Sequence, residues 1–186
     1  QGVGAMAAIL GLDVHQVRDI CAAAEQGDVC EAVNLNSPEQ TVIAGNAAAV
    51  ERAMVAAKDA GAKRALSLPV SVPSHCRLMK SAADELAEYL KNVAFRQPEI
   101  RVIHNVDVAT HQTVDEIKNA LVQQLYRPVR WTETVNLLAQ EGVMQAAECS
   151  PGKVLAGLAK RIHKEMVCAA LVSQTAIDEF ITAQSI

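Results

Sequence analysis

Residues 68–79 read LPVSVPSHCRLM and divide the chain into two differently organised halves. Each proline fixes its own φ and disfavours a helical conformation for the residue before it, so residues 68–74 are predicted to form a rigid extended segment. This segment holds His75 in one place, and histidine is the side chain best suited to proton transfer near neutral pH. A structural role for His75, packing or capping at the start of the next helix, stays open from the residues alone.

The half before this segment is predicted to have the element order βαββαβ. This is the ferredoxin-like or split-βαβ plan, and a length of about 65 residues suits it. Asp13 is the predicted N-cap of the first helix, and residues 36–40 have the composition of a hairpin turn. The predicted elements are a strand at 5–10, a helix at 14–25, strands at 29–35 and 41–44, a helix at 47–60 and a strand at 65–68.

The half after this segment alternates between helix and strand, which favours a parallel sheet covered by helices. We therefore expect an α/β protein with two parts, a ferredoxin-like subdomain at 1–68 and a second subdomain at 69–186. The helices are predicted at 76–91, 114–125, 131–140, 153–164 and 176–183, and the strands at 102–108, 143–149 and 167–172.

The composition excludes several classes of protein. A net charge of −4 and 3% aromatic residues argue against a nucleic-acid surface, which needs clustered cations and stacking rings. Five cysteines without a C-x-x-C pair indicate neither a disulfide framework nor a zinc site, and they suit a reducing cytoplasm. No apolar run reaches the ~18 residues of a membrane span, and no signal peptide is visible. The first methionine, Met6, lies inside an apolar run, so we expect an N-terminal part to be missing.

Two other turns contain residues that could do chemistry. Residues 148–153, ECSPGK, are predicted to link a strand to a helix, where backbone N–H groups could bind an anion. A purely structural turn is the favoured interpretation, because the spacing of a phosphate-binding loop is absent. His104, Asn105 and Asp107 could suggest metal ligands, but no second cluster at ligand spacing supports a metal site.

Six segments together resemble the bacterial malonyl-CoA:acyl carrier protein transacylase family of type II fatty acid synthesis. They occur in the family's order and cover nearly the whole chain. The resemblance implies an α/β-hydrolase-like subdomain interrupted by a ferredoxin-like one, so that residues 69–186 would be the C-terminal portion of the former. The segments are GAMAAILGL (4–12), VNLNSP (33–38), VIAG (42–45), residues 68–79, QLYRPVRW (124–131) and PGKVL (151–155).

The resemblance also implies ping-pong transfer of a malonyl group from coenzyme A, through a serine ester, to the phosphopantetheine thiol of acyl carrier protein. His75 would be the catalytic base and acid, and the backbone carbonyl of Gln124 would orient its ring in place of a carboxylate. Asn36 and Ser74 would lie along the acyl-binding path, although a structural role in the hairpin turn is the favoured interpretation of Asn36. No cofactor is implied, because the coenzyme A thioester is a substrate. The basic pairs Lys63–Arg64 and Lys160–Arg161 would attract the acidic carrier protein, although solvated helix ends explain them equally well.

The chain departs from the family in one serious respect. The family's nucleophile lies in Gly-His-Ser-Leu-Gly, a G-x-S-x-G elbow, and no serine of this chain has glycines at that spacing. The family's oxyanion-hole glutamine and carboxylate-binding arginine would also lie upstream. We therefore expect the 186 residues alone to be inactive and to need the missing N-terminal part as a partner.

Other functions stay open from the sequence. The main alternative is a non-catalytic ferredoxin-like module that binds a carrier protein or a ligand. RNA binding by the sheet is disfavoured, because its inner strands lack stacking aromatic residues. Cysteine hydrolase chemistry at Cys76 is disfavoured as well, since nucleophile and base normally come from separate segments of a chain.

Overall fold

The computed structural model describes residues 4–70 and 72–184 as a mixed α/β fold. The chain divides into two compact units, Gln1–Trp131 and Thr132–Ile186. None of the helices within the described ranges combines the length and the apolar character that a membrane span needs.

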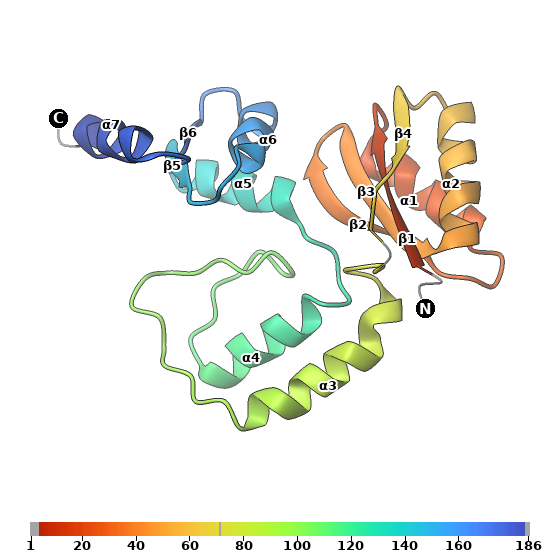
Figure 1. Ribbon diagram of the computed structural model, residues 1–186, viewed down its shortest axis with the longest axis horizontal. Helices are drawn as coiled ribbons and strands as arrows, with labels where there is room; N and C mark the ends of the chain where they lie inside the picture. The colour runs from red at the N-terminus through yellow and green to blue at the C-terminus, as the bar shows by residue number, and fades with distance from the viewer. Residues whose placement is uncertain (1–3, 71, 185–186) are drawn as a thin grey trace. The chain divides into compact units, whose positions relative to one another are not determined.

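The first unit begins with a four-stranded sheet in the order β2-β3-β1-β4, in which every neighbouring pair is antiparallel (Figure 1). The predicted order βαββαβ and the predicted hairpin are confirmed. The hairpin turn is tighter than predicted, because only Pro38 and Glu39 separate the two strands. The elements are β1 (Gly4–Leu10), α1 (Val14–Glu25), β2 (Cys30–Ser37), β3 (Gln40–Asn46), α2 (Ala47–Asp59) and β4 (Arg64–Ser67).

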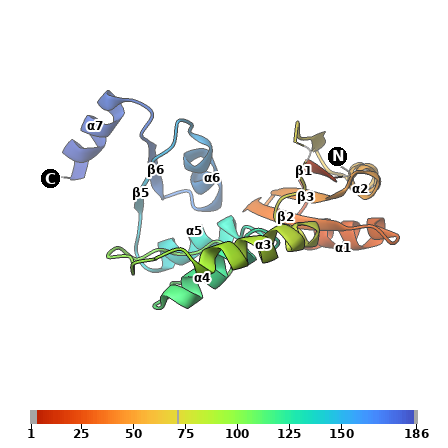
Figure 2. The same cartoon turned by 60° about the horizontal axis from the view of Figure 1, so that its bottom comes forward.

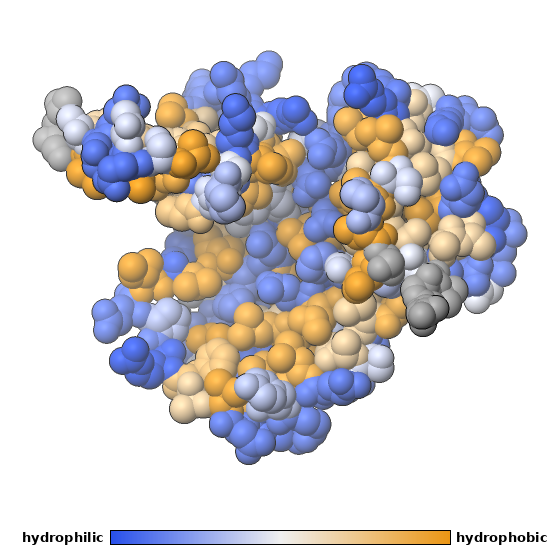
Figure 3. Space-filling view, viewed as in Figure 1, coloured by the Kyte–Doolittle hydropathy of each residue, from blue (hydrophilic) through white to orange (hydrophobic). Residues whose placement is uncertain are grey.

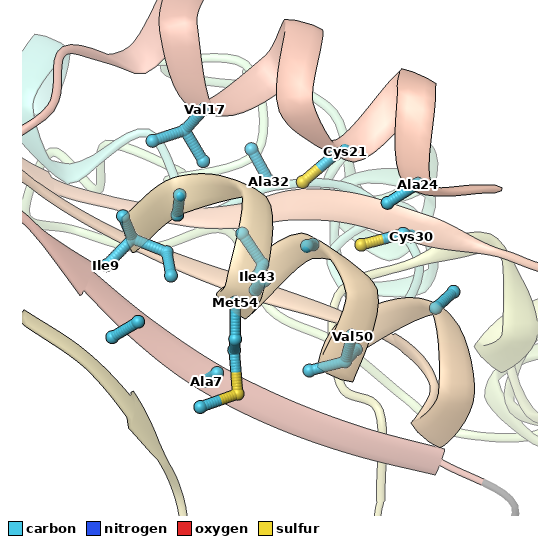
Figure 4. Packing of buried hydrophobic residues seen from close by; sticks show 14 of the residues in the cluster. Ala7, Ile9, Val17, Cys21, Ala24, Cys30, Ala32, Ile43, Val50 and Met54 are labelled. Atoms are coloured by element: carbon cyan, nitrogen blue, oxygen red, sulfur yellow. The ribbon is translucent and has the colours of Figure 1, made fainter. Parts of the chain in front are cut away.

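Both helices of this region pack on one face of the sheet. The core between them includes Ile9 and Ile43 from the strands, Val17 from α1 and Val50 from α2, each no more than 2% exposed (Figure 4). The inner strands β1 and β3 are near-continuous runs of buried and half-buried residues, as expected where both faces of a sheet are covered. In β2 a bulge shifts the register between Ala32 and Asn34.

The opposite face of the sheet carries a smaller buried cluster. It consists of Met6, Val33, Val42 and Ala44 from the strands, together with Cys76, which is fully buried. Because Cys76 comes from the segment after β4, this segment lies against the face of the sheet that α1 and α2 do not cover.

Side chains satisfy the two ends of α1. Asp13 is the N-cap, as predicted, and forms a capping box with Gln16. At the C-terminal end, the guanidinium of Arg52 from α2 donates hydrogen bonds to the carbonyl oxygens of Ala24 and Glu25 and to the carboxylate of Asp28. The last carbonyls of a helix have no partners within the helix, and by binding two of them Arg52 ties α2 to the end of α1.

After β4, the first unit continues with a 3₁₀ turn, η1 (Arg77–Met79), and two helices, α3 (Lys80–Lys91) and α4 (Val114–Gln123). The two helices lie side by side in both views (Figures 1 and 2). The prediction that the first helix begins at Cys76 was wrong. The buried thiol of Cys76 instead donates to the carbonyl oxygen of Pro73, and the α-helix begins at Lys80.

The strand predicted at 102–108 does not form. The backbone N–H of Val108 donates to the carbonyl oxygen of His104, and the N–H of His104 donates to Ala109. Val108 has a φ of 59°, in the left-handed region. The chain therefore reverses direction here, and only an isolated bridge between His104 and Ala109 remains.

The remaining elements alternate between helix and strand, as predicted, although the strands are shorter. β5 and β6 pair in parallel, with Gln145 opposite Val167 and Glu148 opposite Ala170. The parallel pairing predicted for this half is confirmed for these two strands. The elements are α5 (Trp131–Gln140), β5 (Gln145–Glu148), α6 (Val154–Ile162), β6 (Val167–Ala170) and α7 (Gln174–Gln184).

Candidate active site

His75 is half-buried and has a φ of 65°, a left-handed conformation that non-glycine residues rarely adopt. Its backbone N–H donates a hydrogen bond of 3.0 Å to the carbonyl oxygen of Leu125. A conformation of this kind persists only where the surrounding structure enforces it, and such residues cluster at functional sites. The backbone at His75 is therefore a first indication of a site.

The imidazole of His75 is held by the same end of α4. Its Nδ1 lies 2.7 Å from the carbonyl oxygen of Gln124, the C-cap residue of that helix. A carbonyl oxygen only accepts hydrogen bonds, so Nδ1 carries the proton and donates it, while Nε2 is left as an acceptor. Carbonyls at the end of a helix lack partners within the helix, and His75 binds the carbonyl of the C-cap Gln124 as well as that of Leu125, the next residue.

The sheet fixes both partners of this contact. On one side, the N–H of Leu68 donates to the carbonyl oxygen of Met6 in β1, which anchors the segment that leads to His75. On the other side, Val129 exchanges two backbone hydrogen bonds with β2, at 2.8 Å to Val33 and 2.9 Å to Leu35. The end of α4 and the His75 segment are thus both attached to the four-stranded sheet.

Arg77 attaches the His75 segment to the sheet and to α1. Nothing in the sequence had singled out this residue. Its guanidinium donates to Glu31 of β2 at 2.6 Å and to Glu25 of α1 at 2.8 Å, and its backbone N–H donates to Glu31 at 3.2 Å. The three side chains are partly exposed, so solvent screens their charges and the ion pairs add little stability. Their main effect is to hold the segment after His75 against β2 and α1.

Cys76, directly after His75, is a core residue. Burial raises the pKa of its thiol, and its Sγ lies 3.1 Å from the carbonyl oxygen of Pro73. A neutral thiol packed against the sheet is a poor nucleophile. The environment of Cys76 therefore supports the sequence-based preference against cysteine hydrolase chemistry.

The two residues predicted to contact the acyl group lie in different surroundings. Ser74 is half-buried next to His75, and its N–H donates to the carbonyl oxygen of Val72. The sequence placed Asn36 in the hairpin turn, but in the structure it belongs to β2. It lies where the register shifts between Leu35 and Ser37. A bulge can turn a side chain away from the regular alternation of a strand.

The surface beside His75 is apolar. Val70 and Val72 are about half exposed, at 48% and 52%, and Leu78 is 37% exposed. Apolar side chains also gather at the surface over α3 and α4 (Figure 3). Exposed apolar residues that adjoin a polar candidate group are typical of a binding surface.

The predicted basic pairs are on separate elements. Lys63 is exposed and forms an ion pair of 2.8 Å with Glu39, and Arg64 begins β4. Lys160 and Arg161 form the last turn of α6, in the second unit. Cations suit that position because the C-terminal end of a helix carries partial negative charge.

The turn at 148–153 has a structural role, which is the interpretation that the sequence favoured over anion binding. The buried carboxylate of Glu148 accepts hydrogen bonds from the N–H of Ala156 at 2.8 Å and from the hydroxyl of Ser150 at 2.9 Å. These bonds lower the pKa of Glu148, the bond from Ala156 being the largest cause. The chain's own carboxylate thus occupies the start of α6, where an anion could otherwise bind.

His104 and Asp107 meet a residue that the sequence reading overlooked, His111. Nε2 of His111 lies 2.9 Å from Oδ2 of Asp107, and the two histidine rings lie 5.1 Å apart. Burial, and then the neighbouring His111, lower the pKa of His104. Across residues 4–70 and 72–184, no three such side chains gather in a way that could hold a metal ion. The four-residue spacing between Asp107 and His111 is the one feature of the sequence that could have indicated their contact.

Comparisons with known proteins agree with this geometry. The sequence profile of the family described as acyl transferase domain matches residues 1–180. The malonyl CoA-acyl carrier protein transacylase of Haemophilus influenzae is 54% identical over 184 residues, which is 97% of this chain. The chain spans 59% of the length of that relative.

Solved structures give the same result. The malonyl CoA-acyl carrier protein transacylase from Coxiella burnetii matches with a TM-score of 0.96 and 45% identity, covering 97% of this chain and 57% of that one. A second structure holds a type II PKS acyl-carrier protein in complex with its malonyl-transacylase. It matches with a TM-score of 0.97 and 49% identity, covering 98% of this chain and 59% of that one.

Proposed function

The chain belongs to the acyl transferase domain family, and on this basis we propose that it supplies the general base of a malonyl-CoA:acyl carrier protein transacylase. The base is His75, and the carbonyl oxygen of Gln124 is its positioning partner. The observation that carries the proposal is the 2.7 Å contact between Nδ1 of His75 and that oxygen, which leaves Nε2 as an acceptor.

The proposed chemistry has two half-reactions. In the first, Nε2 of His75 takes the proton of a serine hydroxyl as the serine attacks the malonyl thioester, and it then gives that proton to the departing coenzyme A thiolate. In the second, Nε2 takes the proton of the carrier's phosphopantetheine thiol and returns it to the serine oxygen. The serine comes from outside this chain, whose sequence contains no G-x-S-x-G elbow.

We assign the ferredoxin-like plan to residues 1–68 and the C-terminal portion of an α/β-hydrolase-like subdomain to residues 69–186. The antiparallel order β2-β3-β1-β4, with α1 and α2 on one face, supports the first assignment. The parallel pair β5 and β6, with α6 between them in sequence, supports the second.

We assign substrate contacts to Ser74 and Asn36. Ser74 adjoins His75, so its size would limit the room for a substituent on the acyl group. Asn36 lies at a bulge of β2, the strand that also holds Glu31 and, through Val33 and Leu35, the end of α4. The exposed Val70 and Val72 provide apolar surface for a pantetheine chain.

The chain alone should not transfer malonyl groups, because a general base without a nucleophile and oxyanion donors lacks the covalent step. The test joins the chain to the part of the Haemophilus influenzae relative that this chain does not match, and malonyl transfer to carrier protein is measured. The joined protein should be active and the isolated chain inactive. A malonyl ester formed on the isolated chain would contradict the absence of a nucleophile.

His75→Ala in the joined protein should lower transfer by about 10²–10⁴-fold, the usual contribution of an acid–base group. Unfolding midpoints of the two proteins should agree closely, which separates chemistry from folding. The matched control is His15→Ala, an exposed histidine of α1, which should leave transfer unchanged. An unchanged rate in the His75 variant would remove His75 from the mechanism, and carrier binding without transfer would favour the binding-module alternative.

Carrier docking on the basic pairs is tested by charge reversal. Changing Lys63, Arg64, Lys160 and Arg161 to Glu in the joined protein should weaken carrier-dependent turnover and its salt dependence, because a rim charge mainly affects association. Acylation from malonyl-CoA should not change. Lys58→Glu, an exposed residue of α2, is the control. Equal losses in both half-reactions would refute docking at these pairs.

A further inference from the structure

Two cysteines that the proposed mechanism does not use face each other in the first unit. Cys21 lies on α1 and Cys30 is the first residue of β2, and each is 2% exposed. Both belong to the core between the helices and the sheet. Figure 4 shows the two sulfur atoms turned toward each other between α1 and β2.

The two thiols differ in their readiness to ionise. A hydrogen bond from the Cys21 thiol lowers the pKa of Cys30, and Arg52 acts in the same direction. The same hydrogen bond, together with burial, raises the pKa of Cys21 well above its ordinary value. Burial raises the pKa of Cys30 as well but does not outweigh the hydrogen bond, and Glu25 and Glu31 oppose ionisation of both thiols. Cys30 is therefore the thiol of the pair that reacts first, since the thiolate is the nucleophile.

A small cavity gives access to this pair. It has a volume of about 280 Å³ and is lined by both cysteines together with Arg18, Glu25, Glu31 and Pro128. Arg18 is exposed, so the cavity reaches the surface beside it. A cavity of this size admits a molecule as small as hydrogen peroxide.

We propose that Cys21 and Cys30 form a peroxide-sensitive dithiol that closes to an intramolecular disulfide. The Cys30 thiolate attacks one oxygen of hydrogen peroxide, which gives a sulfenic acid and hydroxide. The Cys21 sulfur then attacks the sulfenic sulfur, the S–S bond forms, and the departing hydroxide takes the Cys21 proton as water. Two thiols are oxidised by two electrons in total, and one peroxide is reduced to two waters.

Two of the other three cysteines serve as internal controls. Cys76 is fully buried and donates to the carbonyl oxygen of Pro73, so it should stay reduced in the folded protein. Cys149 is exposed and should be alkylated or oxidised readily. Oxidation of the pair Cys21 and Cys30 can therefore be compared with that of a single buried thiol and with that of an exposed thiol.

The test treats the folded full chain with hydrogen peroxide, alkylates the remaining thiols under denaturing conditions and maps the peptides by mass spectrometry. Residues 19–52 form one tryptic peptide that contains Cys21 and Cys30 and no other cysteine. We expect this peptide to lose both alkylatable thiols and the mass of two hydrogen atoms, and a thiol reductant to restore it. Cleavage after Glu25 should then give two fragments that stay joined until they are reduced.

The variants separate the two steps. Cys21→Ser should leave a sulfenic acid on Cys30 that a 1,3-dione traps, and Cys30→Ser should give neither a linkage nor a trapped adduct at Cys21. Circular dichroism recorded before and after oxidation checks that the treated chain is folded. The proposal is overturned if peptide 19–52 keeps both thiols while Cys149 is oxidised. It is equally overturned if the linkage forms only with loss of structure, or if it joins these residues to other cysteines.

Discussion

At the scale of single residues, two departures from ordinary stability rules stand out, one at the candidate site and one in the core of the first unit. His75 holds a left-handed backbone conformation, which the contacts to Gln124 and Leu125 enforce. Thr41 of β3 is 1% exposed, and its hydroxyl has no hydrogen-bond partner among the described residues. The first departure coincides with the proposed base. The second lies in the core, because Thr41 pairs with Ile9 and Leu35, both of which face α1 and α2.

Thr41→Val should therefore stabilise the protein. The substitution keeps the branched shape and removes a buried hydroxyl without a partner, a group that costs about 1–3 kcal/mol to bury. Chemical denaturation should show a free energy of unfolding higher by about 1 kcal/mol. Thr41→Ser, which keeps the hydroxyl and loses the methyl group, should be less stable than the wild type. A valine variant less stable than the wild type would imply a partner for this hydroxyl.

At the scale of elements, several helix ends are satisfied by side chains that are distant in sequence or on another element. Arg52 of α2 binds the last carbonyls of α1, His75 binds the carbonyl of the C-cap of α4, and Glu148 of β5 binds an amide at the start of α6. The groups at a helix end have no partners within the helix, so these contacts fix how each helix meets its neighbour. The contacts of Arg52 and Glu148 fix the packing of helices, and the contact of His75 also orients the candidate base.

The cap at Glu148 predicts a pH dependence. Its pKa is lower in the folded chain than in the unfolded chain, chiefly because the N–H of Ala156 donates to the carboxylate. The stability from this carboxylate is present above the unfolded pKa and is lost as the pH falls through the folded pKa. Denaturation between neutral pH and pH about 3 should show a smaller loss of stability for Glu148→Gln than for the wild type. Glu165→Gln, at an exposed site, should behave like the wild type.

At the scale of the whole molecule, the two units differ in how much structure supports their strands. β1 and β3 are the inner strands of a four-stranded sheet with a core on each face, whereas β5 and β6 form a pair with few buried residues nearby. Local opening is easiest where buried apolar contacts are few. The second unit is therefore expected to open more often than the sheet of the first.

Hydrogen–deuterium exchange on the folded chain should show this difference. Amides of β1 and β3 should exchange slowest, and those of β5 and β6 clearly faster, in mass spectra of peptides from each unit. Peptides that cover α2 give an internal reference for the protection of a helix in the first unit. Equal protection of both sheets would mean that the second unit is as stable as the first.

Much of this architecture could be predicted from the sequence. Short apolar runs, helical spacing and turn residues predicted the order of all six elements from β1 to β4, and α5 was predicted at its observed bounds. The segment at 102–108 was mispredicted because alternating valines favour a strand, whereas a reversal at Val108 depends on backbone contacts. The bulge in β2 was missed for a similar reason, since it has no local signal.

The candidate site was predictable to a smaller extent. Residue types and the two prolines singled out His75, but only the resemblance pointed to Gln124, because a backbone carbonyl leaves no trace in side-chain identity. Arg77 lies 52 positions from Glu25 and 46 from Glu31 in sequence, so no local pattern predicts the ion pairs between them. The cysteine pair also depends on how α1 packs on β2.

The left-handed conformation of His75 has a consequence for laboratory evolution. A non-glycine residue in that region is strained by about 1 kcal/mol or more, and glycine is not. Selection for thermal resistance alone should then enrich glycine at position 75, whereas alanine keeps most of the strain and gains little. Libraries screened only for survival at high temperature would thus discard the imidazole early, so a screen on this scaffold has to reward turnover as well.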